Sequence, residues 1–217
     1  MTAPDLTMYR LVHRALRVGT AGIAEAAADI HTADERRRTA FAKYWNGYAA
    51  EVLGHHTVED EIFFPALVDR VPVAGALIER TDADHHHLDE LMEAIGRAVG
   101  QVRHGLAAPE LPALTRELVQ HMDTHLDFED ADILPLFERH FTGDEYGALN
   151  EAALKSAGVG KQAAFAVPFI VSVMTDDERQ KALTEAPLPL RLLYRATRRS
   201  HTRLTERAIG RQYVGAA

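Results

Sequence analysis

A histidine–glutamate motif occurs twice in this chain of 217 residues and is its clearest sign of chemistry. His55 lies four residues before Glu59, so the two side chains share one face of a helix. Seventy residues further on, His125 precedes Glu129 with the same spacing. In both copies an aspartate follows the glutamate, and a proline ends the apolar run that comes next. An imidazole and a carboxylate on one helical face can bind a metal ion, and the repetition indicates two related helical hairpins with a shared site.

The duplication extends to one further histidine in each half of the sequence. His13 lies 42 residues before His55, and His85 lies 40 residues before His125. Two such hairpins packed with pseudo-twofold symmetry bring four imidazoles and two carboxylates together. Burying these groups without a cation is costly, so the pattern predicts a metal site. Its six predicted ligands are His13, His55, Glu59, His85, His125 and Glu129.

The donor types restrict the metal and its chemistry. The chain has no cysteine, so every protein ligand must be a nitrogen or an oxygen atom. Carboxylates can bridge two cations, and a pocket of carboxylates and imidazoles favours iron or manganese over metals that prefer thiolates. Six protein ligands leave coordination positions open on two six-coordinate ions. Dioxygen, peroxide, nitric oxide or water can occupy such positions.

The elements that must position these residues are predicted to be helices. Apolar residues recur every three or four positions, and no convincing strand alternation is present. We expect helices over about 5–29, from 32 or 34 to 69, from beyond 72 to 100 or 104, and from 109 or 112 to 140. Asp5 is expected to cap the first helix and Pro65 to bend the end of the second. Short connections predict an all-α fold with an antiparallel four-helix bundle.

The residues after the bundle predict a separate set of helices. We divide the chain into a bundle of residues 1–142 and a C-terminal helical extension of residues 143–217. Helices are expected over about 144–157, 161–174, 176–187 and 189–210. The last one is expected to dock on the bundle through an apolar face of Leu192, Leu193, Leu204 and Ile209.

Charge and hydropathy patterning bear on partners and location. The net charge is −8, although residues 190–217 hold seven arginines against one glutamate. A nucleic-acid partner is disfavoured because the acidic remainder would repel phosphates. The first thirty residues lack the apolar core of a signal peptide, and no stretch reaches the length of a membrane span. We therefore expect a cytoplasmic protein without a membrane partner, and no motif indicates a protein partner.

On these residues, the sequence resembles the hemerythrin-like family of HHE cation-binding domains over roughly residues 5–140. The resemblance implies that the six residues bind iron and that Glu59 and Glu129 are the bridging ligands. It also implies two iron ions, joined by an oxo or hydroxo bridge, that bind or reduce dioxygen, peroxide or nitric oxide. A peroxide- or nitric-oxide-consuming oxidoreductase fits this pattern, and so does an iron- or oxygen-sensing module without turnover. A scaffold whose site is occupied by zinc or is empty is the third alternative.

The pattern departs from that of the oxygen-carrying members. Those proteins have seven ligands, including two histidines four apart on the third helix, whereas Thr81 and Asp89 flank His85 at that spacing. The final bridge is Glu129 rather than an aspartate. Both features resemble bacterial and iron-sensing members, some of which use the residue after the second-helix histidine. His56 stands there and is our candidate for a seventh ligand.

Other residues near the motifs have simpler interpretations. His121, one turn before His125, is a candidate ligand or supporting residue. Asp60 and Asp130 are expected to point outward or to support the ligands, and Tyr9 or Tyr48 could face the pocket. His86 and His87 are expected to face solvent, and the remaining histidines are expected at the surface or at helix ends. These are His31, His104, His140 and His201. A ferritin-like site is disfavoured because no Glu-x-x-His element is present.

Overall fold

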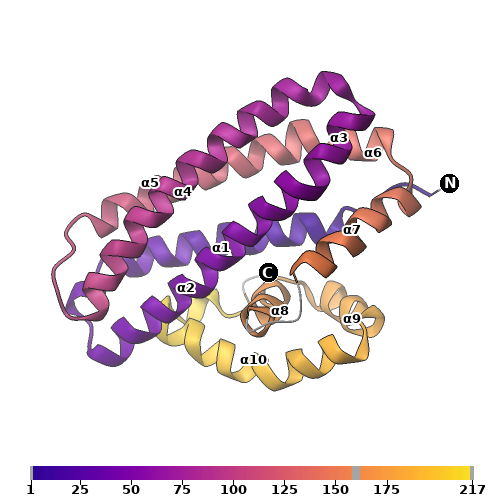
Figure 1. The fold of residues 1–217 in the computed structure, drawn as a ribbon. Coiled ribbons are helices and arrows are strands. Elements are labelled where there is room, and N and C mark those ends of the chain that lie inside the picture. The colour runs from indigo at the N-terminus through magenta and orange to yellow at the C-terminus, as the bar shows by residue number, and fades with distance from the viewer. Residues whose placement is uncertain (1, 158–161, 216–217) are drawn as a thin grey trace.

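The chain folds as a helical bundle in a computed structural model that describes residues 2–157 and 162–215. None of these residues forms a strand. Four long helices lie side by side, and short connections make successive helices alternate in direction (Figure 1). Helix α1 packs against α2 and α5, and α4 packs against α2 and α5, which closes the four-helix bundle. The four are α1 (Thr7–Ala27), α2 (Glu35–Val58), α4 (Gly75–Arg103) and α5 (Leu111–Phe128). The predicted all-α bundle is therefore confirmed.

Two of the predicted long helices contain a π-helical segment near their ends. The second helix passes through a π-helical segment into α3 and ends at Arg70, and the fourth passes through a second π-helical segment into α6 and ends at His140. The segments are Glu59–Phe63, α3 (Phe64–Arg70), Glu129–Ile133 and α6 (Leu134–His140). Both metal motifs therefore lie where an α-helix changes into a π-helix.

The proline that follows each π-helical segment explains why the segment forms. Pro65 has no N–H group, so it cannot donate to the carbonyl of Glu61 as an α-helix requires. The N–H of Phe64 instead donates to the carbonyl of Glu59, five residues earlier. In the second copy, before Pro135, the same bond runs from residue 134 to residue 129. We expected Pro65 to bend the helix, but spacing alone did not predict a π-helical segment, a feature that often marks functional sites.

Two apolar clusters of the core lie on either side of the predicted metal motifs along the helices. On α1, Leu16 belongs to one cluster and Tyr9 to the other, and His13 lies between them in sequence. On the second helix, Val52 and Phe63 flank His55 in the same way. The motifs therefore occupy a polar layer between two apolar sections of the core. Tyr44, Trp45 and Tyr48 are buried in the same cluster as Leu16 and Val52.

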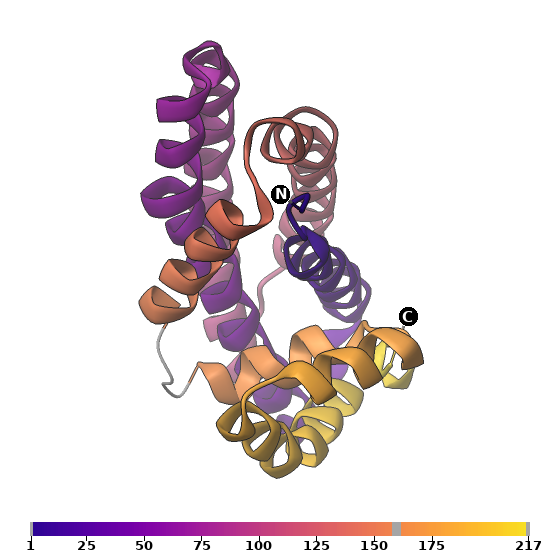
Figure 2. The same cartoon turned by 90° about the vertical axis from the view of Figure 1, so that its right-hand side faces the viewer.

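The C-terminal extension forms the predicted helices and packs on the bundle. Helices α8 and α10 contact both each other and α2, α8 also contacts α1, and α7 contacts α2 (Figures 1 and 2). Thr175 begins α9 with a capping box to Glu178. The helices are α7 (Gly143–Ala157), α8 (Ala163–Ser172), α9 (Asp176–Glu185) and α10 (Leu188–Ala208). Lys161, the predicted start of α8, lies outside the described residues.

The docking face of α10 differs from the predicted one. Leu192 is 52% exposed, so its predicted place in that face is wrong. His201, predicted at the surface, is buried and packs against Tyr44 and Phe165. The buried face of α10 runs through His201, Thr205 and Ala208, and Ile209 follows it. Its composition is partly polar, so hydrophobicity alone did not identify it.

Within residues 2–157 and 162–215, no helix combines the length and the apolarity that crossing a bilayer requires.

Candidate metal centre

The six predicted ligands converge in the interior of the bundle. Helix α1 supplies His13, α4 supplies His85, and each of the other two helices supplies one histidine and one glutamate at its π-helical junction. Five of the six residues are buried, and the side chain of His55 is only 8% exposed. The two glutamates lie at the first residue of each π-helical segment. The local backbone thus positions both carboxylates in the same way.

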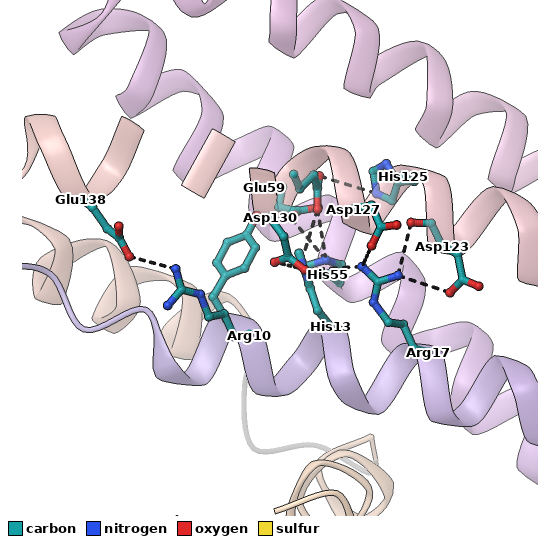
Figure 3. Close-up of polar contacts among 12 residues, drawn as sticks. Arg10, His13, Arg17, His55, Glu59, Asp123, His125, Asp127, Asp130 and Glu138 are labelled. Carbon is teal, nitrogen blue, oxygen red and sulfur yellow. Dashed lines mark hydrogen bonds and ion pairs between the residues drawn. The ribbon is translucent and has the colours of Figure 1, made fainter. Parts of the chain in front are cut away.

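Two groups of donor atoms share the two carboxylates. In the first group, which we call the first position, the Nε2 atom of His13 lies 3.2 Å from Glu129 Oε2. The Nε2 atom of His55 lies 3.2 Å from Glu59 Oε1 and 4.0 Å from Glu129 Oε2 (Figure 3). Donor atoms of these four residues all lie within 4.8 Å of one another. The arrangement is that of a cation site with two imidazoles and two carboxylates.

The second position uses the other oxygen of each carboxylate. The Nε2 atom of His85 lies 3.5 Å from Glu59 Oε2 and 4.0 Å from Glu129 Oε1. The Nε2 atom of His125 lies 3.5 Å from Glu129 Oε1. These four residues also offer donor atoms within 4.8 Å of one another. Each glutamate therefore lies between two histidine pairs, which is the placement that bridging carboxylates require.

The donor atoms fit a bound cation. The Nε2 atoms of all four histidines are buried and have no hydrogen-bond partner among the described residues. The same holds for one carboxylate oxygen of Glu59 and for both of Glu129. Such unpaired groups are costly to bury, and a cation bound between them compensates this cost.

Burial shifts the pKa values of both glutamates and of two histidines, His55 and His125, toward their neutral forms. Desolvation raises the pKa of Glu59 and Glu129, and the negative charge of Glu59 raises that of Glu129 further. Desolvation lowers the pKa of His55 well below its usual value and that of His125 to about 3. The imidazoles of His55 and His125 therefore stay neutral, with a lone pair free for a metal. The carboxyl groups must release their protons when a cation binds.

An aspartate orients one histidine of each half. The Nδ1 atom of His13 lies 2.9 Å from Asp130 Oδ1, and that of His85 lies 3.1 Å from Asp60 Oδ1. An Nδ1–H donated to a carboxylate leaves the Nε2 lone pair directed at the centre. Arg17 lies 3.4 Å from Asp130 and also contacts two acids on α5 (Figure 3). Both aspartates thus support the ligands, as the sequence led us to expect.

The sequence profile of the hemerythrin HHE cation binding domain matches residues 5–137, more than half of the chain. The chain belongs to this family. No curated protein and no solved structure matches it. The profile ends before α7, so the hemerythrin match covers the bundle and leaves out the extension. A centre of two HHE-type motifs inside the bundle agrees with the cation binding for which the family is described.

Two further side chains make the hemerythrin centre unsymmetrical. His56 is buried and stacks on His85, with ring centroids 3.9 Å apart. One of its ring nitrogens lies within 4.8 Å of a ring nitrogen of His85 and of one of His125. Neither ring nitrogen of His56 has a hydrogen-bond partner among the described residues, and Nδ1 lies 3.9 Å from Asp89 Oδ1. The predicted seventh ligand is therefore beside the second position. On the side of the first position, the Tyr9 hydroxyl donates to Glu59 Oε1. Tyr48 instead bonds Thr20 in the core.

His121 does not join the centre, so its prediction as a ligand or supporting residue is wrong. It is exposed, and Met122 takes the buried place on α5 beside Leu118. Successive residues on a helix lie about 100° apart around its axis, so His121 and Met122 point in different directions and Met122 is the one that faces the core. His86 and His87 are exposed as expected. The buried face that leads to His125 runs through Leu118 and Met122, and the apolar side chain of Met122 was the sequence signal that favoured it over His121.

Proposed function

We propose that this hemerythrin domain binds two iron ions and uses them to bind or reduce dioxygen, peroxide or nitric oxide. The supporting observation is that Glu59 and Glu129 each face both histidine pairs with separate oxygens. His13 and His55 would hold the ion in the first position. His85 and His125, with His56, would hold the ion in the second position. Bound iron would supply redox chemistry and coordination positions that the protein leaves open.

The protein residues control protons and water around this site. Asp60 and Asp130 hold the Nδ1 protons of two histidines, so those rings present Nε2 to the centre. The Tyr9 hydroxyl keeps its proton because burial raises its pKa well above the usual range. It donates that proton to Glu59 in a hydrogen bond. The two apolar clusters on either side exclude bulk water, which suits a site for a small apolar or weakly polar ligand.

A metal assay with an optical titration tests this proposal. Protein loaded with iron should contain about two iron ions per chain, and its near-ultraviolet spectrum should change on exposure to at least one of the three small ligands. The Glu129→Gln variant is the matched control, because it removes a charged group shared by both positions. An iron-loaded protein whose spectrum responds to none of the three ligands would contradict the proposal.

A sensor without turnover is the second candidate, and a contact of the extension favours it. Helix α7 contacts the π-helical segment that begins with Glu59, and α8 contacts α1 and α2, the helices that carry His13 and His55. A change in iron occupancy at the first position would therefore affect helices that are in direct contact with the extension. Limited proteolysis with and without iron tests this candidate. Identical digestion of residues 143–217 in both states would argue against sensing.

A further inference from the structure

A second group of metal-binding side chains lies on the surface, outside the buried centre. His87 is on α4, whereas Glu117 and His121 are one turn apart on α5, and all three are exposed. The two histidine Nε2 atoms lie 3.0 Å apart, and the Nε2 atom of His87 lies 4.0 Å from Glu117 Oε1. The three residues offer ligand atoms within 4.8 Å of one another. We call this group the surface triad.

The spacing within the surface triad suits one small cation. Two imidazole nitrogens that bind zinc at about 2.0–2.1 Å lie roughly 3.3 Å apart in a tetrahedral site, close to the observed separation. Glu117 and His121 share one helical face because they are four residues apart. His87 reaches them from the adjacent helix, and α4 and α5 pack against each other. Three donors on two rigid helices therefore need little rearrangement to close on a metal ion.

We propose that the surface triad is a zinc site, with His87, Glu117 and His121 as ligands and water in the fourth position. Two imidazoles and one carboxylate form a typical zinc donor set. Such nitrogen and oxygen donors bind Zn²⁺ more tightly than Fe²⁺, whereas the buried pair of carboxylates suits iron. The zinc ion would connect α4 to α5, the two helices that carry His85 and His125. This site is independent of the proposed iron chemistry because none of its ligands belongs to the buried centre.

Zinc titration of the iron-loaded, full-length protein tests the inference by calorimetry and by elemental analysis after washing. Wild-type protein should bind one more zinc ion than His121→Ala and His87→Ala. Loss of a supporting contact alone weakens metal binding about 10- to 100-fold, so loss of a ligand should weaken this step by about 100-fold or more. The matched control is His86→Ala, which removes an exposed neighbour on α4 that lies near Asp82. It should bind zinc like the wild type.

The comparison between variants separates this site from the buried centre. Zinc that enters the buried centre adds the same amount to the zinc content of the wild type and of the three variants. The iron contents of the four proteins should also be equal. Zinc should raise the Tm of the wild type and of His86→Ala more than that of the two triad variants, because only the former two gain the link between α4 and α5. Equal zinc binding by the wild type and His121→Ala, or a wild type without the additional zinc ion, would overturn the inference.

Discussion

The two halves of the hemerythrin centre have the same predicted ligands but different neighbours. Tyr9 lies four residues before His13, whereas Thr81 occupies the equivalent place before His85. His56 follows the histidine of α2, whereas Leu126 follows that of α5. The duplicated pattern therefore supplies two groups of donor atoms of the same kind, and these two sequence differences make their surroundings unequal. The first position has a phenol hydrogen bond to Glu59, and the second has an additional imidazole.

This difference leads to an expectation about where a small ligand binds. If His56 binds metal, the second position has three imidazoles and two carboxylates. The first position has two imidazoles and the same two carboxylates. The first position then keeps more coordination positions open, next to the Tyr9 hydroxyl. The extension also covers the helices of the first half, since α8 contacts α1 and α2. Access to the more open position is therefore expected to depend on α8.

The largest effect is expected from changing a carboxylate that both positions share. Glu129→Gln should reduce iron from about two ions per chain to nearly none, because both groups of donors contain this residue. Elemental analysis after iron loading and desalting measures the loss. Glu138→Gln, which changes an exposed partner of Arg10, is the control and should retain its iron. Retention of two ions by Glu129→Gln would show that the carboxylate is not shared.

Removal of a histidine should separate the two positions. His13→Ala removes a ligand of the first position alone, and His125→Ala removes a ligand of the second alone. Each variant should therefore keep about one iron ion per chain. The optical response to small ligands should weaken in both variants. Loss of both ions from either variant would mean that the positions fill only together.

His56→Leu tests the asymmetry directly, because leucine stands at the equivalent place in the other half. The variant should still bind two ions, but the affinity of the second position should fall by about 100-fold or more if His56 is a ligand, because loss of a supporting contact alone weakens metal binding about 10- to 100-fold. Competition with a chelator measures this change. An unchanged affinity would leave His56 as a packing residue that only stacks on His85.

A pair of equivalent residues outside the centre shows how the extension distinguishes the halves. Glu51 lies four residues before His55 and bonds Gln162, whereas His121, four residues before His125, is exposed. Burial raises the pKa of Glu51 to about 7. The folded state therefore binds more protons than the unfolded state between about pH 4.5 and 7, and stability falls as the pH rises through this range.

Glu51→Gln should remove that dependence. At about pH 8 the variant is expected to be about 1–3 kcal/mol more stable than the wild type, and the difference should vanish near pH 4. Urea unfolding at both pH values, at equal metal content, measures it. The exposed Glu90→Gln variant should show no such gain. A pH-independent difference would mean that the Gln162 contact, rather than the charge, decides stability.

Tyr9→Phe is expected to have the smallest effect. The variant loses one hydrogen bond to Glu59 and keeps the packing of the ring on Phe63, so it should lose about 1 kcal/mol of stability without iron. Iron content should not change, whereas the response of the first position to small ligands should. Thr81→Val, the equivalent change in the other half, should leave that response unaltered.

Much of the fold and of the site follows from helical periodicity. A spacing of four residues places His55 with Glu59 and His125 with Glu129 on one face each, whatever surrounds them. The repetition of this motif, with His13 and His85 upstream, was sufficient to predict six convergent side chains in a four-helix bundle. The buried α10 face could not be predicted in this way, since His201 and Thr205 are polar and their burial depends on the helices that cover them.

The sequence by itself determined the donor types, their pairing along each helix and the duplication of the two halves, because these depend only on the local geometry of a helix. Only the tertiary structure decided that His56 stacks on His85, that Asp130 supports His13 from another helix, and that His121 meets His87 at the surface. These contacts join residues that are distant in sequence. Their partners depend on the register and rotation of packed helices, which hydrophobic spacing within one helix does not specify.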